Sequence, residues 1–291
     1  MITLSNGHSF TFIAASGALA YDGRGWPWEW PLRWAGLIDP GLFTVVTKTL
    51  TRHPRRGNLR WYNPLRCIRP LPAGAVNAVG LTNPGIEWWC REVAPTIAKK
   101  RYRLIVSLEA EEEKGLSEMI GMVEKVRSDN LVAIELNASC PNTFKEGERS
   151  TSRTIALCHA AKKMTALPLL LKIGVTHDPL TLARELPQII EAFQINSVPW
   201  SIAFPQKVSP LSRFGGGGVS GRIAQKWTWK VAGELAAAGP IPVVGPSPWD
   251  YEDIGELFRL GAKAISFGSV FLWHPWRPTL FVRRWMRDGG A

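Results

Sequence analysis

Short apolar segments of strand length alternate with longer amphipathic segments along the whole chain. This alternation favours a parallel sheet whose strands are joined by helical crossovers. Eight strands close a (β/α)8 barrel, and the 291 residues exceed the roughly 250 that such a barrel needs. The strand candidates are 9–17, 43–50, 103–110, 131–139, 168–174, 195–203, 241–247 and 264–271. We therefore predict an α/β fold of the (β/α)8 TIM-barrel type.

Helical periodicity separates these strands. The helix candidates are 86–99, 112–128, 151–164, 180–193, 223–238, 250–260 and 279–287, with a shorter, Trp-rich one at about 28–35. Asp250 is expected to cap the helix that follows it, because its carboxylate can accept hydrogen bonds from the free backbone amides.

Two segments, at about 51–83 and 204–221, are too rich in Pro, Gly and Arg for simple connections. They follow the second and sixth strands, so we predict insertions there within a single barrel domain spanning residues 1–291. Long loops at one rim of a barrel usually build its active site. A Rossmann fold is the alternative, but the glycine run at 215–218 does not lie in an opening strand–turn–helix unit.

The formal net charge of +11 is compatible with nucleic acid, a membrane surface or an ordinary solvated basic surface. We expect the last of these and no nucleic-acid partner. No apolar run reaches the about 18 residues of a membrane span, and the N-terminus lacks a targeting pattern. We therefore expect a cytoplasmic protein without stable membrane insertion. The four cysteines lack the spacing of a zinc site, which predicts reduced thiols and no metal.

The segment 135–142 runs from an apolar strand into a polar turn that holds a thiol between two amides. Residues just beyond a buried strand are displayed at the rim of a barrel. There Cys140 could move a proton while Asn137 and Asn142 bind a planar polar substrate. Burial as a small apolar residue is the alternative for Cys140.

Two lysines also end predicted strands, Lys48 the second and Lys172 the fifth. Lys172 follows three leucines, and a cation there needs a negative or electron-rich partner. The alternative for Lys172 is a purely structural ion pair or a side chain that extends to solvent. Asn77 lies in the first insertion, where it could close over the same rim or simply occupy a turn.

Together these segments resemble the dihydroorotate dehydrogenase family, whose members are FMN-dependent (β/α)8 barrels. The similarity runs through most of the chain, and Cys140 resembles the base of the soluble class 1 enzymes. The segments that carry it are AASG at 14–17, VTKTL at 46–50, NASCPN at 137–142, LKI at 171–173, GGVSG at 217–221, and the glycine-containing pairs at 261–262 and 268–269.

The resemblance implies that Cys140 takes the C5 proton of dihydroorotate while C6 delivers hydride to the flavin. Lys172 would stabilise negative charge on the reduced flavin, and Lys48 would contact flavin and position the substrate. The implied FMN site is Ala15, Ser16, Gly17, Lys48, Thr49, Asn137, Lys172, Gly218, Ser220, Gly221, Gly245, Ser247, Gly268 and Ser269. The implied substrate site is Asn77, Gly80, Leu81, Asn137, Asn142, Ser197 and Trp200.

The chain departs from the family pattern after its sixth strand. The family has a further asparagine following Asn-Ser-Val, whereas this chain continues with Pro199 and Trp200. A substrate amide is therefore lost there. Trp200 either stacks on the ligand or fills the mouth of the barrel.

A second departure lies at 244–249, where prolines replace a glycine-rich phosphate turn. Proline has no N–H to donate. Phosphate binding would then depend on the backbone amides of Ser247, Trp249, Gly268 and Ser269.

The sequence thus predicts an FMN-dependent oxidoreductase that converts dihydroorotate, or a related dihydropyrimidine, to orotate in pyrimidine biosynthesis. The alternatives are an inactive or RNA-binding flavoprotein paralogue, and a barrel lyase that forms a Schiff base on Lys172. We expect a homodimer. The electron acceptor is left open between fumarate, quinone, and NAD reached through an iron–sulfur partner.

Overall fold

Eight parallel strands form the central sheet of the computed structural model, which describes residues 1–60, 62–139 and 151–290. Their spatial order is β10-β9-β8-β7-β4-β3-β14-β13. Phe193 of β10 bridges to Val243 beside β13, so the two edges meet and the sheet curls into the predicted barrel. The strands are β3 (Phe12–Ala14), β4 (Thr44–Val46), β7 (Leu104–Leu108), β8 (Leu131–Asn137), β9 (Leu169–Ile173), β10 (Ala192–Ile195), β13 (Val244–Gly245) and β14 (Ala264–Phe267).

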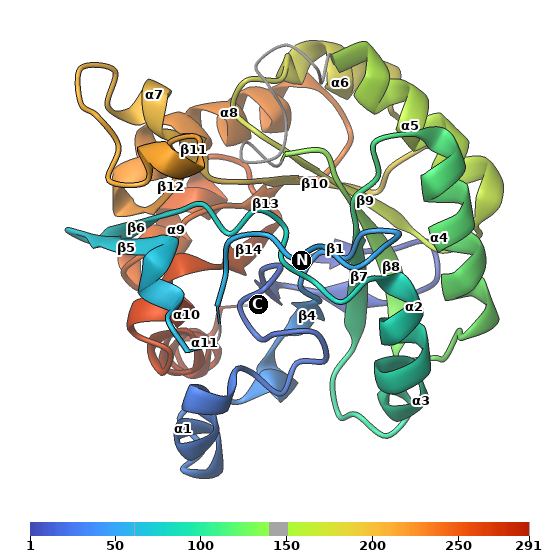
Figure 1. Cartoon of the computed structure of the whole chain (residues 1–291), viewed down its shortest axis with the longest axis horizontal. Coiled ribbons are helices and arrows are strands. Elements are labelled where there is room, and N and C mark those ends of the chain that lie inside the picture. Colours follow the sequence, from blue (N-terminus) through green and yellow to red (C-terminus); the bar gives the residue numbers. More distant parts are fainter. Residues whose placement is uncertain (61, 140–150, 291) are drawn as a thin grey trace.

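Helices surround this barrel because each buries an apolar stripe against the outer face of the strands (Figure 1). The crossover at 86–97 is a helix with a central π segment, and the helix at 151–164 has the predicted bounds. The outer helices are α2 (Ile86–Trp88), η4 (Trp89–Val93), α3 (Ala94–Ile97), α4 (Glu113–Lys125), α5 (Thr151–Met164), α6 (Pro179–Glu185), α8 (Gln225–Ala238), α9 (Glu252–Arg259) and α11 (Arg277–Arg287). Shorter turns are η1 (Pro27–Glu29), α1 (Trp30–Trp34), η2 (Pro40–Leu42), η3 (Pro64–Arg66), α7 (Trp200–Ala203), η5 (Ser212–Phe214), η6 (Arg222–Ala224) and α10 (Ser269–Trp273).

An N-terminal hairpin closes the end of the barrel where the strands begin. It pairs β1 (Ile2–Thr3) with β2 (Ser9–Phe10) in antiparallel fashion. Ile2, Leu4 and Phe10 pack against an apolar layer inside the barrel that includes Ile13 and Val46. The strand predicted at 9–17 is therefore two strands, β2 in the hairpin and β3 in the barrel.

The two predicted insertions meet in a second, antiparallel sheet, which we call the accessory sheet. Its order is β11 (Val198–Pro199), β12 (Gly218–Gly221), β6 (Gly74–Asn77) and β5 (Ile68–Leu71). In Figure 1 it lies to one side of the barrel strands. Segments that are well over 100 residues apart in the chain thus form one layer.

The sixth strand was predicted at the wrong place. The barrel strand is Ala192–Ile195, not 195–203, and the helix before it ends at Glu185 rather than 193. After Ile195 the chain leaves the barrel: Val198–Pro199 pairs with β12, and Trp200–Ala203 turns into α7. The apolar residues within 195–203 pack in the accessory sheet. A local apolar pattern does not distinguish such a segment from a barrel strand.

The predicted cap of α9 is also wrong. The side chain of Asp253 accepts hydrogen bonds from the backbone amides of Trp249 (2.7 Å) and Asp250 (3.0 Å). Asp250 instead forms ion pairs with Arg222 and Arg277. Competition from these two arginines explains why the Asp250 carboxylate faces away from the helix amides.

Candidate active site

A cavity of about 470 Å³ lies at the carboxyl ends of the barrel strands, the end where barrel enzymes place their chemistry. Its wall combines strand ends with residues of the accessory sheet. Of the predicted site residues, the cavity is lined by Ala15, Ser16, Gly17, Lys48, Thr49, Asn77, Gly80, Leu81, Asn137, Lys172, Ser197, Ser220, Gly268 and Ser269. Residues in or just after six barrel strands and residues of both insertions are therefore brought together.

The floor of the cavity is built by alternate residues of neighbouring strands. Side chains two residues apart share one face of a strand. Along β8, Ala133 lies in the apolar layer inside the barrel, and Glu135 and Asn137 follow at successive inward positions. Along β9, Leu170 lies in the same apolar layer and Lys172 follows it. The interior thus changes from apolar to polar as it approaches the cavity.

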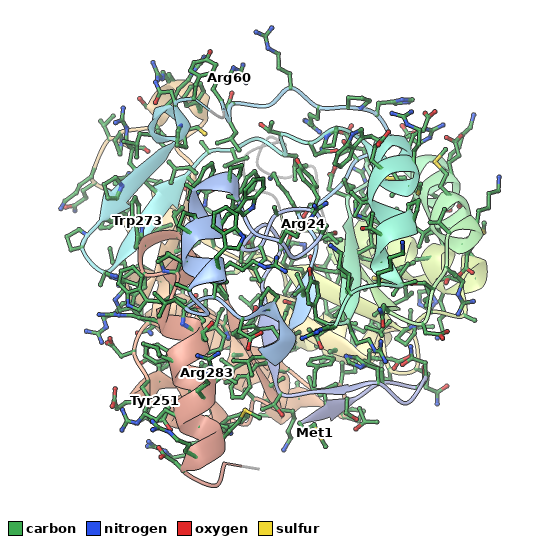
Figure 2. All side chains as sticks on the ribbon, turned by 90° about the horizontal axis from the view of Figure 1, so that it is seen from below. Met1, Arg24, Arg60, Tyr251, Trp273 and Arg283 are labelled. Carbon is green, nitrogen blue, oxygen red and sulfur yellow. The ribbon has the colours of Figure 1, made fainter. Side chains whose placement is uncertain are left out.

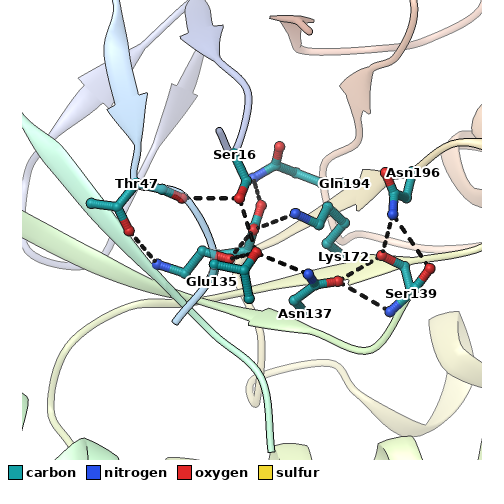
Figure 3. Close-up of polar contacts among 10 residues, drawn as sticks. Ser16, Thr47, Glu135, Asn137, Ser139, Lys172, Gln194 and Asn196 are labelled. Atoms are coloured by element: carbon teal, nitrogen blue, oxygen red, sulfur yellow. Dashed lines mark hydrogen bonds and ion pairs between the residues drawn. The ribbon is translucent and has the colours of Figure 1, made fainter. Parts of the chain in front are cut away.

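Glu135 is the centre of this polar layer and is fully buried. It accepts hydrogen bonds from Ser107 Oγ (2.6 Å), Lys172 Nζ (2.7 Å) and Gln194 Nε2 (2.7 Å). Figure 3 shows Lys172 and Gln194 close to Glu135. Burying a charge in this way requires a partner of opposite sign and further hydrogen bonds, and both are present. Lys172 therefore forms an internal ion pair and also lines the cavity.

Sequence reasoning did not identify Glu135. The signal was its position, an acidic residue inside an otherwise apolar strand, two residues before Asn137. Such a residue needs a buried cation on a neighbouring strand. The sequence predicted that Lys172 needs a negative or electron-rich partner. The register between β8 and β9 that places Glu135 beside Lys172 is a tertiary property.

A chain of hydroxyl and amide groups fixes the next layer of the cavity. Ser16 Oγ donates to the carbonyl of Thr47 (2.9 Å) and is hydrogen-bonded to Thr49 Oγ1 (2.9 Å). Asn137 Nδ2 donates to the same Thr49 hydroxyl (3.0 Å). Since Asn137 Oδ1 accepts from both the amide (3.2 Å) and the hydroxyl (2.6 Å) of Ser139, its side chain has a defined orientation.

Asn196 is a cavity residue that the sequence analysis passed over in favour of its neighbours. Its Nδ2 donates to Ser139 Oγ (2.9 Å) and to the Ser139 carbonyl (3.3 Å). It therefore connects the end of β10 to the segment just before residue 140 (Figure 3). The signal available was an asparagine one residue after a buried strand. Cys140 and Asn142, the other members of the predicted signature loop, lie outside the described residues.

Part of the cavity wall is aromatic, and the sequence did not predict it. Trp26 and Trp28 stack with ring planes 2° apart and centroids 5.3 Å apart, and Trp26 Nε1 donates to the Gly17 carbonyl (3.0 Å). Glu29 lies beside them, only 3% exposed, and accepts a hydrogen bond from the Trp26 amide (2.7 Å). Burial raises the pKa of Glu29 to about 7, although that hydrogen bond acts in the opposite direction. The density of tryptophan at 26–34 was the available signal.

Trp200 does not line the cavity. Its ring packs against Phe204 with centroids 4.5 Å apart and lies in an apolar cluster with Val76 and Val219 of the accessory sheet. Its Nε1 donates to the carbonyl of Lys207 (2.7 Å). The tryptophan therefore has the packing role, and stacking on a ligand in this cavity does not fit its position.

Four of the predicted cofactor residues are likewise absent from the cavity wall. Gly218 and Gly221 belong to β12, where a Cβ at Gly221 would lie 2.6 Å from the Ala73 carbonyl oxygen. Gly245 is buried, and a Cβ there would lie 3.1 Å from atoms of Leu257 and of Ile265. The Ser247 carbonyl accepts a hydrogen bond from Gln225 (3.0 Å). Close packing around the backbone therefore explains the glycines at 221 and 245.

The Trp249 amide, one of the four expected to hold a phosphate, is already used. It donates to the Asp253 carboxylate at 2.7 Å, as described for the start of α9. A carboxylate next to this amide would repel an anion. The backbone of Gly268 and Ser269, which line the cavity, is the remaining predicted part of that site.

The arrangement defines a class of protein: a (β/α)8-barrel enzyme with a buried cation and amide groups at the floor of a ligand-sized cavity. A family model described as dihydroorotate dehydrogenase matches residues 33–275. The chain belongs to the dihydroorotate dehydrogenase family. This confirms the expected resemblance, and with it an oxidoreductase of the dihydroorotate dehydrogenase type.

Similar proteins come from both sequence and structure. The chain is 29% identical over 242 residues to the "Dihydroorotate dehydrogenase B (NAD(+)), catalytic subunit" of Desulforudis audaxviator, covering 81% of this chain and 76% of that protein. The protein with the same description from Geobacillus kaustophilus is 28% identical, covering 79% and 73%. The ligand-free dihydroorotate dehydrogenase of Eimeria tenella superposes with a TM-score of 0.64 at 17% identity, covering 94% of this chain and 81% of that one. That structure supports the barrel fold alone.

One further finding concerns membranes. Within the described ranges, every helix is too short or too polar to cross a bilayer.

Proposed function

We propose that this chain oxidises dihydroorotate to orotate with FMN bound in the cavity at the strand ends. The observation that carries the proposal is the Lys172–Glu135 pair, which places a fixed cation at the floor of the cavity beside Asn137. A reaction that transfers a hydride to a planar cofactor builds negative charge on that cofactor. A cation held by a buried carboxylate can stabilise such charge without reorganising.

The residues of the cavity fit FMN. The volume of about 470 Å³ is in the range of small-molecule sites, roughly 300–1,000 Å³. Ala15, Gly17 and Gly268 leave room for a flat ring, and hydroxyls of Ser16 and Thr49 supply polar contacts. We assign the cofactor to these residues together with Lys48, Asn137, Lys172, Ser220 and Ser269. When bound, FMN supplies the hydride acceptor.

The chain's own residues bind the substrate and remove its proton. We assign Cys140 as the base that removes the proton from C5 of dihydroorotate. Lys48, Asn77 and Ser197 line the cavity and would orient the pyrimidine, with Asn142 from the signature loop. Gly80 and Leu81 form the turn after β6 that borders the same space. Asn196 joins this set, since its amide is directed at Ser139, next to the proposed base.

The proposed reaction also needs a protein or small molecule that accepts its electrons. The relatives described as dihydroorotate dehydrogenase B are catalytic subunits, a description that implies further subunits. We propose that this chain also passes its electrons to a separate electron-transfer protein and assembles as a homodimer in the cytoplasm.

An anaerobic titration tests the proposal. The protein purified with FMN should be yellow, and the flavin absorbance should bleach on addition of dihydroorotate. Cys140→Ser should keep the bound flavin and slow the bleaching by about a hundredfold or more, because a hydroxyl is a poorer base near neutral pH. A protein that cannot take up FMN, or a flavin that dihydroorotate leaves oxidised, would show that the proposed reaction is wrong.

The Schiff-base alternative is not favoured. The amine that attacks a carbonyl must be free to approach it, whereas Lys172 Nζ donates a hydrogen bond of 2.7 Å to the fully buried Glu135 carboxylate. Borohydride trapping with a carbonyl substrate should leave Lys172 unmodified.

A further inference from the structure

The accessory sheet carries a charge distribution that the proposed reaction does not use. Residues 51–83 contain six arginines and no acidic residue, and residues 196–222 contain three basic residues and again no acidic one. The two segments pair through strands of the accessory sheet, so the loops and turns that carry most of these charges extend from one sheet. Two paired segments with nine cations and no acidic residue are unusual, because surfaces normally intersperse both signs.

Some of these cations are balanced by acidic residues elsewhere. Arg52 pairs with Glu118, Arg55 with Glu111, and Arg222 with Asp250. The other six have no acidic partner among the residues that the structure describes. We call these six the basic lip: Arg56, Arg60, Arg66, Arg69, Lys207 and Arg213.

Contacts within the basic lip hold like charges close together. The guanidinium groups of Arg66 and Arg213, from the two different segments, both lie over the ring of Phe214, at 5.6 and 4.7 Å from its centroid. Arg60 donates to three backbone carbonyls of its own loop. Fixed cations without counter-charges repel one another, and this repulsion is relieved when an anionic surface binds.

The basic lip borders the cavity. Leu59, Leu65 and Ile68 line the cavity, and Arg60, Arg66 and Arg69 are their immediate neighbours in sequence. Figure 2 shows Arg60 at one end of the molecule, with Met1 near the opposite end. A molecule bound to the basic lip would therefore lie next to the mouth of the active site.

Large apolar side chains are exposed among these cations. Tyr62 is 69% exposed, Leu65 49% and Val208 87%. Protein interfaces are enriched in arginine and tyrosine and depleted of lysine, and the basic lip has five arginines to one lysine. A membrane-surface site typically has an amphipathic helix, and a site for single-stranded RNA typically has several exposed aromatic rings. The lip residues lie in loops, two short 3-10 turns and one strand, and Tyr62 is the single largely exposed ring in the described part of the lip.

We propose that the basic lip is the docking surface for an acidic electron-carrier protein. The carrier's redox role rests on the proposed function, because oxidation of dihydroorotate releases two electrons that must leave the cavity. The acceptor of the two electrons is a redox group held by that protein. Docking at the lip brings its acidic face against the arginines and its redox group toward the cavity mouth.

A charge-matched pair of variants tests the docking surface. The lip variant is Arg56→Gln/Arg69→Gln/Arg213→Gln, three exposed residues that do not line the cavity. The control is Arg101→Gln/Arg103→Gln/Lys263→Gln, three exposed residues near the amino ends of β7 and β14. Both variants lose three positive charges, so they have equal net charge and differ only in where the charge was removed.

The probe is a purified flavodoxin, a small acidic electron carrier, and the readout is its dissociation constant from the FMN-loaded protein. We expect wild type and control to bind at 25 mM salt, with affinity that falls about tenfold or more by 250 mM. The lip variant should bind about tenfold more weakly than the control. Equal affinity of the two variants, or no binding by wild type, would overturn the proposal.

Two further measurements separate the remaining outcomes. If a uridine oligomer or phosphatidylserine vesicles bind the lip more tightly than flavodoxin at the same salt, the assignment to a protein is wrong. Reduction of a small dye by dihydroorotate should be the same in all three proteins. Absence of dye reduction in wild type would refute the proposed function and leave the docking result to be judged on binding alone.

Discussion

The ammonium of Lys172 lies at the end of a strand whose other inward residues are apolar, and Glu135 on the adjacent strand balances its charge. A buried ion pair contributes little net stability after desolvation, so its value is in fixing position. Here the position is the floor of the cavity. One residue pair thus explains both why a charged layer is tolerated in the barrel and how a cation is presented to a ligand.

Glu29 gives a testable pH dependence at the same scale. Its pKa in the folded protein is about 7, above the ordinary value of 4.5. The folded state therefore binds this proton more tightly than the unfolded state. The contribution of this protonated carboxyl to the free energy of unfolding is fully present below about pH 4.5 and is lost as the pH rises through 7.

We expect Glu29→Gln to remove this loss, since an amide keeps the oxygen that accepts from Trp26 but does not titrate. In urea unfolding, the variant should gain roughly 2 kcal/mol relative to wild type between pH 5 and pH 8. Glu185→Gln, at an exposed glutamate, is the control and should show the same difference at both pH values. If the difference in unfolding free energy between Glu29→Gln and wild type is also the same at both pH values, the Glu29 carboxyl titrates normally.

At the scale of elements, the accessory sheet determines how the first insertion reaches the cavity. β6 carries Asn77, and the glycine turn before β12 packs directly against it. Gly217 has φ of +87°, and a Cβ there would lie 2.7 Å from the Asn77 carbonyl oxygen. Glycine is required at this position both by the backbone angle and by the close approach.

Gly217→Ala should therefore displace Asn77. Gly215 is the matched control, because its φ of +83° is similar but a Cβ there would meet nothing within 4 Å. We expect Gly217→Ala to cost about 2 kcal/mol more stability than Gly215→Ala and to weaken orotate binding, whereas Gly215→Ala should leave that binding near wild type. Unfolding curves and orotate titrations check this, and equal effects of the two variants would contradict the contact.

At the scale of the whole molecule, the barrel separates stability from chemistry. The N-terminal hairpin closes the amino ends of the strands, and Leu4, 2% exposed, packs into the apolar layer there. The cavity lies at the other end. In barrels, residues at the amino end serve stability and those at the carboxyl end serve catalysis.

Leu4→Ala should consequently lower the free energy of unfolding by about 3 kcal/mol through loss of buried area and the cavity it leaves. The dihydroorotate kcat/KM of the folded protein should stay within about twofold of wild type. Leu180→Ala, at a residue 58% exposed, should change stability by less than about 0.5 kcal/mol. A large loss of kcat/KM in folded Leu4→Ala protein would show that the two ends are coupled.

The strand–helix alternation of the sequence was sufficient to predict the barrel, and the polar residues at strand ends were sufficient to place Lys48, Asn137 and Lys172 in one cavity. Both follow from local rules: period, length and the fact that parallel strands end at one edge. The helix at 151–164 was correct for the same reason. The sequence alone therefore determined the fold class and the end of the barrel that carries the site.

The tertiary structure decided which residues meet. It paired the two insertions as one sheet, carried Trp200 away from the cavity and brought Trp26 and Glu29 into its wall. It also set Glu135 beside Lys172 through the register of two strands. Contacts between distant segments depend on shape and register across the whole barrel, and a local pattern carries no information about either.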